Sequence, residues 1–454
     1  MSLSELSTEI DEMIIQYLPQ RAVHNLMLTN KYYRKIAEPY LYRNVQVRSP
    51  NILSIPRLLL TLISRRELSQ HIRSFAFDIA NEQWEADLHY LRYYDPNNTI
   101  EKASKDLSKK SSEVQKALKD LAYPLKEPLF DVTWYYSMSR EIWAIDASLA
   151  LILCLATNLE HLRLMNMSSA IIEAVCPARW QRLTKSASLG VWPLGKLKSL
   201  DVYLGKEAAI PILAPIETLK ASGARTFPNN TFHHDLQWSH RGSKRITFLR
   251  NLELQHITLQ PDQLHRMLEL PEMHGIQSLK MKNVCIDGPY YDYSRLGRLL
   301  RILLPSLKIF ECTHGTTGWT PRTKRPFTSF KELTQLQELT ITLELMTPQD
   351  RLISDTPVHL FHPKGFFPDS LRALQIRHFP RSLIYDLVDK ICLNSQTNNY
   401  LLITAASLGL SSFDLGIASG AREEPGYKSK LLLLLKETIC RFKDFGTSME
   451  ILSV

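Results

Sequence analysis

The start of the chain alternates apolar and polar residues at the spacing of short amphipathic helices. Five apolar residues recur at intervals of three and four positions and share one helical stripe: Ile10, Met13, Ile14, Tyr17 and Leu18. Pro19 ends this helix, because a proline pushes the residue before it out of the α region. A second helix is expected over about residues 21–28, a third ending at Pro39, and a short extended segment up to Val47. Three short helices cannot bury all their apolar faces among themselves, so part of this surface is expected to dock elsewhere.

A second pattern, apolar-x-x-apolar-x-apolar, runs through the rest of the chain. Its copies begin at positions 72, 159, 197, 249, 276, 307, 336, 371 and 449, with a degraded copy at 216. The pattern alone is weak, but the residues between its apolar positions are mostly polar, and copies from 159 to 371 recur about every 30 residues. Helical patterns fill several gaps, such as residues 261–270 and 293–304, whereas residues 376–449 hold no clear copy. The pattern predicts an α/β fold in which strand–helix units stack into an irregular solenoid with parallel strands.

Alternation along each strand predicts which side chains face a ligand. Leu252 and Leu254 are expected to point into the core, so Glu253 and Gln255 face the concave side. The same logic selects Arg163, Asp201, Tyr203, Lys280, Lys282, Glu311, Thr313, Thr340, Gln375 and Arg377. We expect Arg163, Tyr203, Glu253, Lys280, Lys282 and Arg377 among the substrate contacts. Because the lining mixes charges, it does not indicate a ligand of a single sign.

Two long loops interrupt the repeats. The segment 313–330 contains Trp319 and Arg322, two residue types that are enriched at binding hot spots, and loops on a rigid scaffold often carry recognition. Both are therefore candidate substrate contacts. The alternative is that this segment is a solvent-exposed loop between two repeats. The segment 222–244 contains the pair His233-His234 without an acidic or cysteine partner at helical spacing, which favours a surface loop over a metal site.

The patterns divide the chain into three parts. Residues 1–48 form the helical module, residues 49–150 a mostly helical connector with the first repeat, and residues 151–454 the repeat domain. Within the connector, Leu58–Ile63 suits a buried helix. The charged segment 101–122 is expected to be a solvated amphipathic helix, with a partner-binding helix as the alternative.

Composition narrows the possible functions. A hydrophobic fraction of 44% and a charged fraction of 22% are globular values, so disorder is not expected. The net charge of +9 is diluted along the chain, which makes a nucleic-acid partner unlikely from sequence.

The six cysteines form no CxxC pair, so no metal is expected, and reduced thiols favour the cytoplasm or nucleus. No apolar run reaches the ~20 residues that span a bilayer. Since GxGxxG, Walker, HExxH and GxSxG motifs are absent, neither an enzyme nor a cofactor is expected.

The N-terminal residues resemble the F-box. The similarity runs through Leu6-Ser7-Thr8-Glu9-Ile10, Ile14, Tyr17-Leu18-Pro19, Leu26-Met27-Leu28-Thr29-Asn30-Lys31, Arg34, Ile36-Ala37 and Glu38-Pro39-Tyr40-Leu41-Tyr42-Arg43. In that family the helices bind a Skp-type adaptor, which connects the protein to a cullin–RING ubiquitin ligase, and the remaining chain recruits a protein substrate. Leucine-rich repeats are common in such proteins.

The resemblance implies a set of adaptor contacts: Leu6, Ser7, Ile10, Ile14, Leu18 and Leu26. Apolar side chains on a helix suit docking into a groove of a partner. The family usually has Leu-Pro where this chain has Leu6-Ser7, so it lacks the proline that presets the first turn and packs on the partner. The alternative is a three-helix cap that shields the end of a larger domain.

Overall fold

The computed structural model of the chain describes most of its helices and strands. The described residues are 7–48, 54–78, 113, 116, 143–167, 194–204, 216–223, 249–259, 261–269, 273–286, 291–313, 325–342, 345–346, 366–379, 412–417 and 448–453. The chain forms two compact units, the first of residues 1–221 with 227–247 and the second of residues 222–226 with 248–454. The expected helix at 101–122 lies almost entirely outside the described residues.

The first unit begins with three helices, as the apolar spacing predicts, although the first ends at Ile15 and not at the expected Pro19. They are α1 (Thr8–Ile15), α2 (Gln20–Met27) and α3 (Lys31–Arg43). Their shared core consists of Ile15, Val23, Tyr33 and Ala37. The expected end of the third helix at Pro39 is wrong, because α3 continues through Arg43. A proline this close to a helix end removes a single backbone hydrogen bond, and the last turn survives that loss.

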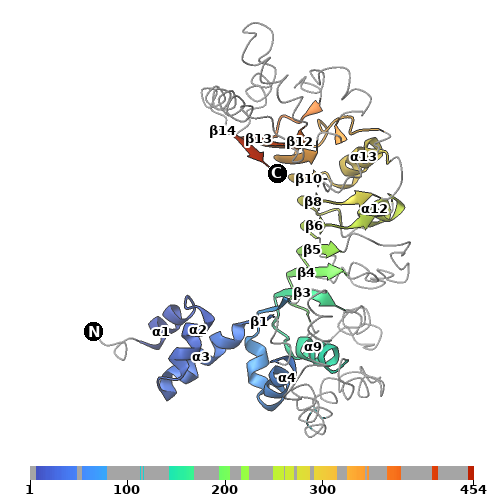
Figure 1. The fold of residues 1–454 in the computed structure, drawn as a ribbon. Helices are drawn as coiled ribbons and strands as arrows, with labels where there is room; N and C mark the ends of the chain where they lie inside the picture. Colours follow the sequence, from blue (N-terminus) through green and yellow to red (C-terminus); the bar gives the residue numbers. More distant parts are fainter. Residues whose placement is uncertain are drawn as a thin grey trace, which may run out of the picture. The chain divides into compact units, whose positions relative to one another are not determined.

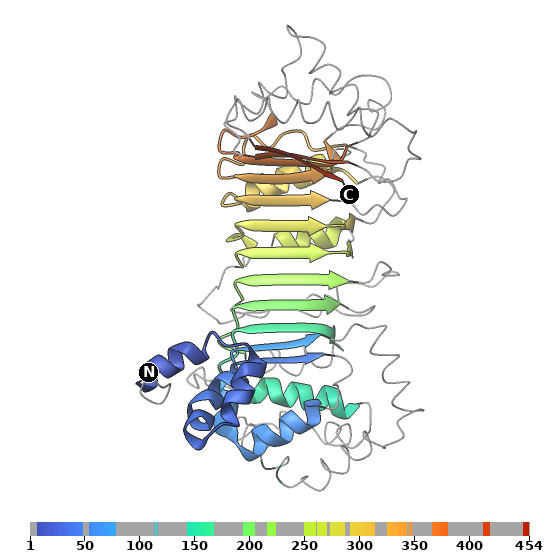
Figure 2. The same ribbon diagram turned by 60° about the vertical axis from the view of Figure 1, so that its left-hand side comes forward.

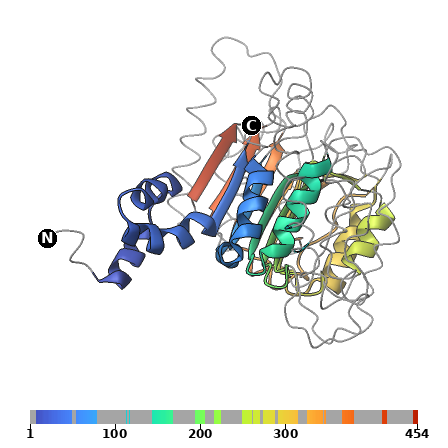
Figure 3. The ribbon, with the colours of Figure 1, turned by 90° about the horizontal axis from the view of Figure 1, so that it is seen from below.

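The sheet of the first unit follows directly from α3. Its strands are β1 (Asn44–Arg48), β2 (Ser74–Asp78), β3 (His161–Met167), β4 (Ser199–Leu204) and β5 (Thr218–Gly223), in that order, and β1 to β4 pair in parallel. The helices α4 (Ser54–Ser64) and α9 (Trp143–Leu155) pack together with the 3-10 helix η3 (Arg66–His71). Figure 1 and Figure 3 show α4 and α9 on one side of these strands, with α1–α3 beyond the edge strand β1. The buried helix expected at Leu58–Ile63 is therefore confirmed as part of α4.

The second unit repeats the same arrangement. Its parallel strands are β6 (Asn251–Gln255), β8 (Ser278–Lys282), β10 (Ile309–Thr313), β11 (Glu338–Thr342), β12 (Ala373–Phe379), β13 (Ser412–Ile417) and β14 (Ser448–Ser453), in that order. The short strands β7 (Thr258–Leu259) and β9 (Cys285–Ile286) pair separately. The helices α12 (Pro261–Leu268) and α13 (Tyr293–Leu303) confirm two expected helices. Figure 2 shows the strands of each unit pointing in one direction.

Each repeat is joined to the next by backbone hydrogen bonds at the start of its strand. The carbonyl of Gln277 accepts the N–H groups of Lys308 and Ile309, at 2.7 and 2.9 Å. One repeat later, the carbonyl of Lys308 accepts the N–H groups of Gln337 and Glu338, at 2.8 and 3.0 Å. The apolar residues of the predicted pattern lie on these strands and are buried, as the side chains of Leu279, Phe310 and Leu339 show. The pattern therefore locates each strand because its apolar positions form the core.

The structure corrects part of the loop expected at 313–330. Phe327 and Phe330 are buried, and their rings stack with centroids 5.0 Å apart. Phe327 also lies against Tyr293 of α13 and Phe310 of β10. The end of this segment is thus part of the core of the second unit, because its aromatic side chains fill the space between α13 and the sheet.

Candidate binding surfaces

The helix α1 buries one side and exposes a larger apolar side. Ile15 is 1% exposed and packs into the helical core, and Asp11, one turn earlier, is buried beside it. In contrast, Ile14 is 41% exposed and Tyr17, just after the helix, is 82% exposed. All residues of the predicted apolar stripe except Leu18 are thus exposed and lie outside the module's own core.

These side chains belong to a larger set of exposed apolar residues in the helical module. We call this set the apolar helix surface: Ile10, Met13, Ile14, Tyr17, Leu28 and Tyr32. In the described part of the chain, Ile302 on α13 is the only other large hydrophobic residue that is strongly exposed. Exposed apolar side chains that are gathered on one module indicate a surface that another molecule covers.

Polar contacts hold the helices under this surface together. The Tyr32 hydroxyl donates to Asp11 Oδ2 at 2.9 Å, which ties α3 to the buried side of α1. The Asn30 side chain accepts from the Tyr33 N–H at 2.8 Å and caps the start of α3. Ser7 is the N-cap residue of α1, although its side chain makes no capping hydrogen bond. Hydrogen bonds from the Glu9 backbone N–H and the Ser7 side chain lower the pKa of the Glu9 carboxyl.

The expected adaptor contacts fall into three groups. Ile10, Ile14 and Ser7 are exposed, whereas Leu18 and Leu26 are partly buried against the helical core. Leu6 lies outside the described residues. Tyr17, Leu28 and Tyr32 belong to the same surface but were not among the expected contacts. Tyr17 shares the helical stripe of Ile10 and Ile14, so its spacing was the signal that pointed to it.

The sheet of the first unit carries a chain of polar contacts on the face opposite its core. The Gln46 side chain donates to Asp78 Oδ2 at 2.6 Å. Arg163 Nε lies 3.0 Å from Asp78 Oδ1 and 3.5 Å from Asp201 Oδ2. Lys220 Nζ lies 4.0 Å from the same Asp201 oxygen. Charged residues of both signs therefore alternate across β2 to β5.

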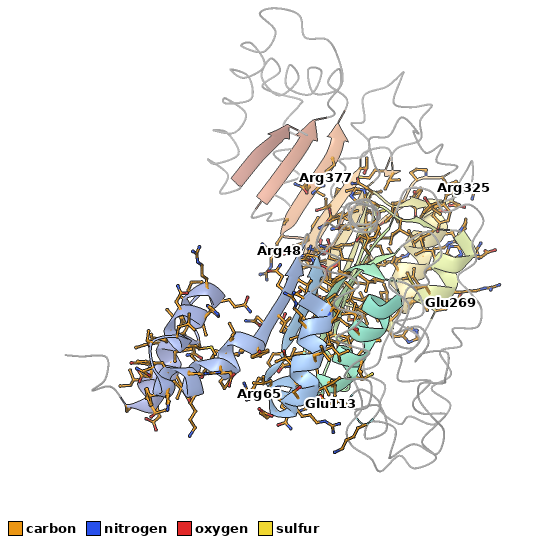
Figure 4. All side chains as sticks on the ribbon, turned by 60° about the horizontal axis from the view of Figure 1, so that its bottom comes forward. Arg48, Arg65, Glu113, Glu269, Arg325 and Arg377 are labelled. Carbon is orange, nitrogen blue, oxygen red and sulfur yellow. The ribbon has the colours of Figure 1, made fainter. Side chains whose placement is uncertain are left out.

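The second unit has an equivalent chain of contacts. Lys282 Nζ lies 2.8 Å from Glu253 Oε1 and 3.8 Å from Glu311 Oε2. Arg377 Nη2 lies 3.5 Å from Glu311 Oε1, and Arg377 Nε donates to Gln375 Oε1 at 3.1 Å. We call the set Glu253, Lys280, Lys282, Glu311, Gln375 and Arg377 the polar sheet face of the second unit. Figure 4 shows Arg377 on its strand.

The candidate substrate contacts can be placed on these faces. Arg163 and Tyr203 occupy positions on the first sheet that alternate with buried Leu162 and Val202. On the second sheet, Glu253 and Lys280 lie between buried residues, and Lys282 and Arg377 each follow a buried residue, Met281 and Ile376. Trp319 and Arg322 lie outside the described residues. Asp78 and Lys220 complete the first chain of contacts and were not among the candidates.

Cys154 and Cys312 are buried free cysteines. Burial raises the pKa of the Cys154 and Cys312 thiols to about 12, so neither is a reactive thiolate at neutral pH. Within the described ranges, no three His, Cys, Asp or Glu residues are arranged to hold a metal ion. Nor does any helix there have the length and apolar character that a bilayer crossing requires.

The sequence was also compared with known proteins. A scan against protein-family models finds no matching family, and a search of curated proteins finds no match.

Proposed function

We propose that this protein is a substrate-recruiting subunit of a cullin–RING ubiquitin ligase. In this proposal α1 to α3 are an F-box that docks on a Skp-type adaptor, and the repeats are leucine-rich repeats that present a protein substrate. The chemistry of ubiquitin transfer belongs to other subunits. This chain contributes proximity, since it holds substrate lysines near the charged conjugating enzyme.

The observation that carries the proposal is the apolar helix surface. The helices already have a closed core of Ile15, Val23, Tyr33 and Ala37, so the module does not need Ile14 or Tyr17 for its own packing. Leaving such side chains in water forgoes roughly 1.5–3 kcal/mol for each one that could be fully buried. A partner that covers them recovers this free energy, which suits helix-in-groove docking. A cap that merely shields the chain's own repeats would instead bury this surface.

The repeats support the second half of the proposal. The predicted apolar pattern coincides with parallel strands in both units, and the polar side chains between its positions lie on the opposite face. A row of parallel strands fixes these side chains at regular spacings, so they can recognise an extended surface of another protein.

The proposal is tested by co-purification of the full chain with a Skp-type adaptor. The native chain is expected to elute with the adaptor, whereas Ile14→Asp places a charge in the covered surface and is expected to prevent the complex. Ile302→Asp is the matched control, because Ile302 is 74% exposed on α13 of the second unit. The proposal fails if the native chain does not bind the adaptor, or if Ile14→Asp binds it as well as Ile302→Asp does. In that case the better interpretation is a repeat scaffold that binds a protein or nucleic acid outside any ubiquitin ligase.

A further inference from the structure

The helical module separates its charges along the chain. Residues 13–37 contain four cations and no Asp or Glu: Arg21, Lys31, Arg34 and Lys35. Their formal charge of +4 is a large share of the +9 of the whole chain. The acidic residues of the three helices lie outside this segment, at Glu9, Asp11, Glu12 and Glu38. The two sheets differ from it, since their cations pair with carboxylates across neighbouring strands.

Three of these cations are exposed to solvent. They are Arg21 on α2 and Lys31 and Lys35 on α3, and we call them the exposed cations. Among the residues that the structure describes, no ion pair or side-chain hydrogen bond involves any of them. Lys31 and Lys35 are four positions apart, so they share one side of α3.

Two carboxylates that contact α3 are engaged by other groups. Asp11 is 3% exposed and accepts a hydrogen bond from a tyrosine hydroxyl of α3. Glu38 is bound by both terminal nitrogens of Arg65, which also binds Glu67 of η3. The charge of Arg34 helps to lower the pKa of the Glu38 carboxyl. These carboxylates therefore do not compensate the exposed cations.

The position of Lys31 is unfavourable for α3 itself. Lys31 is the first residue of this helix, and no acidic residue occupies the first turn. The free backbone N–H groups at the start of a helix carry a partial positive charge, so a cation there destabilises the helix. A charge that is kept where it costs stability indicates a role in binding.

Leu28 places an apolar side chain beside these cations. It follows the last residue of α2 and is 73% exposed. Arg21 lies two helical turns earlier and so shares the side of α2 on which Leu28 lies. Lys31 follows three positions later, and three residues span at most about 11 Å. A segment that covers Leu28 is therefore within reach of cations on both helices.

A ligand of this surface has to be apolar and acidic at once. A nucleic-acid backbone would pair with the cations but offers no apolar group for Leu28. An anionic bilayer offers both, yet its headgroups would meet Glu9 and Glu12, which adjoin Ile10 and Met13 of the apolar helix surface. A protein suits the module better, because it can present carboxylates to α2 and α3 and other groups to α1.

We propose that the exposed cations bind the carboxylates of an acidic, amphipathic segment of a partner protein, and that apolar side chains of the same segment cover Leu28. The segment is taken to belong to the Skp-type adaptor, and in this respect the inference rests on the proposed function. An exposed ion pair contributes little affinity by itself, so the cations chiefly select and orient the partner. The apolar helix surface supplies most of the affinity.

Fluorescence anisotropy of the full chain with labelled probes tests the proposal. Three amphipathic peptides carry leucines at helical spacing, and their remaining positions are Glu, Gln or Lys. Duplex DNA and vesicles of phosphatidylglycerol and phosphatidylcholine are the other probes. The native chain is expected to bind the Glu peptide most tightly near physiological salt, and less tightly as salt rises. The proposal is overturned if the Gln peptide, the DNA or the vesicles bind the chain as tightly as the Glu peptide.

Variants of α3 test the cations directly. Lys31→Gln with Lys35→Gln is expected to weaken binding of the Glu peptide by about threefold or more. Lys31→Glu with Lys35→Glu is expected to prefer the Lys peptide, a gain that an unfolded module would not show. Arg57→Glu with Arg298→Glu is the matched control, because both residues are exposed and lie outside α1 to α3. The proposal is overturned if either double variant binds the peptides as the control does.

Co-purification of the same variants with the Skp-type adaptor separates this proposal from the proposed function. If the adaptor binds the native chain and all variants alike, and the peptides show no charge preference, the proposed function stands and the acidic segment is ruled out. If the peptides follow the charges of α3 but the adaptor does not bind, the site for an acidic segment stands and the proposed function fails.

Discussion

The guanidinium of Arg65 binds both carboxylate oxygens of Glu38. Nη1 donates to Oε1 at 2.6 Å and Nη2 to Oε2 at 2.7 Å, which joins α3 to the turn between α4 and η3. The Arg73 N–H also donates to the carbonyl of Arg43, where α3 passes into β1. These contacts attach the helical module to the sheet of the first unit.

Loss of this pair is expected to destabilise the first unit in a pH-dependent way. Hydrogen bonds from Arg65 lower the pKa of the Glu38 carboxyl, so the folded state binds fewer protons than the unfolded one. The stabilisation is therefore complete above the ordinary Glu pKa of 4.5 and is lost as the pH falls through the lowered folded value. Glu38→Gln is expected to reduce the free energy of unfolding by about 1 kcal/mol near pH 7, since Arg65 is partly exposed.

Urea unfolding of the native chain and the variant, across a range of pH, measures this difference. The two stabilities are expected to converge below pH 4.5. Glu67→Gln is the control, because Glu67 also contacts Arg65 but is largely exposed. A Glu38→Gln variant as stable as the control at neutral pH would contradict the prediction.

The helical period predicted which residues share a side of α1, but not where that side points. Ile10, Ile14 and Tyr17 do lie together, yet an amphipathic stripe looks the same in a sequence whether it faces its own core or a partner. The residue that does face the core, Ile15, was missed. It lies one turn after the polar Asp11, whose burial is compensated in part by a hydrogen bond from the Tyr32 hydroxyl. That contact joins residues 21 positions apart and leaves no local signal.

The strands were better predicted, because each one contributes the same buried positions. The exception is β13, in the segment where no clear copy was expected. The spacing is in fact present at Leu410, Phe413 and Leu415, but the apolar run before it obscures the pattern. The ion pairs could not be predicted. Arg163 meets Asp78 only through the register of β2 and β3, and the chain between these strands has no pattern that sets the register.

Ile14 and Ile15 provide a matched pair that separates binding from stability. Ile15→Ala leaves a cavity in the helical core and is expected to cost about 2–4 kcal/mol of unfolding free energy. Ile14→Ala removes a side chain that is 41% exposed, so its stability cost is expected to be below about 1 kcal/mol. Circular dichroism during urea unfolding checks stability, and titration with the Skp-type adaptor checks binding. The reverse order of stabilities would show that the core assignment is wrong.

Gly297 of α13 is packed too closely to accept a side chain. A Cβ atom at this position would lie 3.2 Å from Phe327 Cδ1. Phe327 cannot give way easily, since its ring contacts Tyr293, Phe310 and Phe330. Alanine gains about 1 kcal/mol of helix propensity over glycine, but overpacking costs about 1–3 kcal/mol. We expect Gly297→Ala to lower the melting temperature and Gly297→Val to lower it further, with Arg298→Ala as the neutral control. A higher melting temperature for Gly297→Ala would show that Phe327 moves freely.

Acidification is expected to destabilise the second unit through His265. This buried side chain shares a hydrogen bond with the Tyr291 hydroxyl through Nε2, at 2.9 Å, and its Nδ1 has no hydrogen-bond partner among the residues that the structure describes. Burial lowers the pKa of His265, and Arg295 lowers it further, against a smaller opposite effect of Asp262 and Glu269. The unfolded state therefore binds a proton first as the pH falls below the ordinary value of 6.5, and folding stability falls with it.

Hydrogen exchange, resolved by mass spectrometry over α12, α13 and β8, measures this effect between about pH 7.5 and pH 5. Once corrected for the intrinsic exchange rate, protection is expected to decline with falling pH in the native chain. His265→Gln keeps a polar group beside Tyr291 but cannot titrate, so its protection is expected to depend less on pH. Tyr291→Phe removes the hydrogen-bond partner and is expected to cost about 1 kcal/mol at neutral pH. Equal pH dependence in the native chain and His265→Gln would rule out His265 as the titrating group, because the variant has no imidazole to protonate.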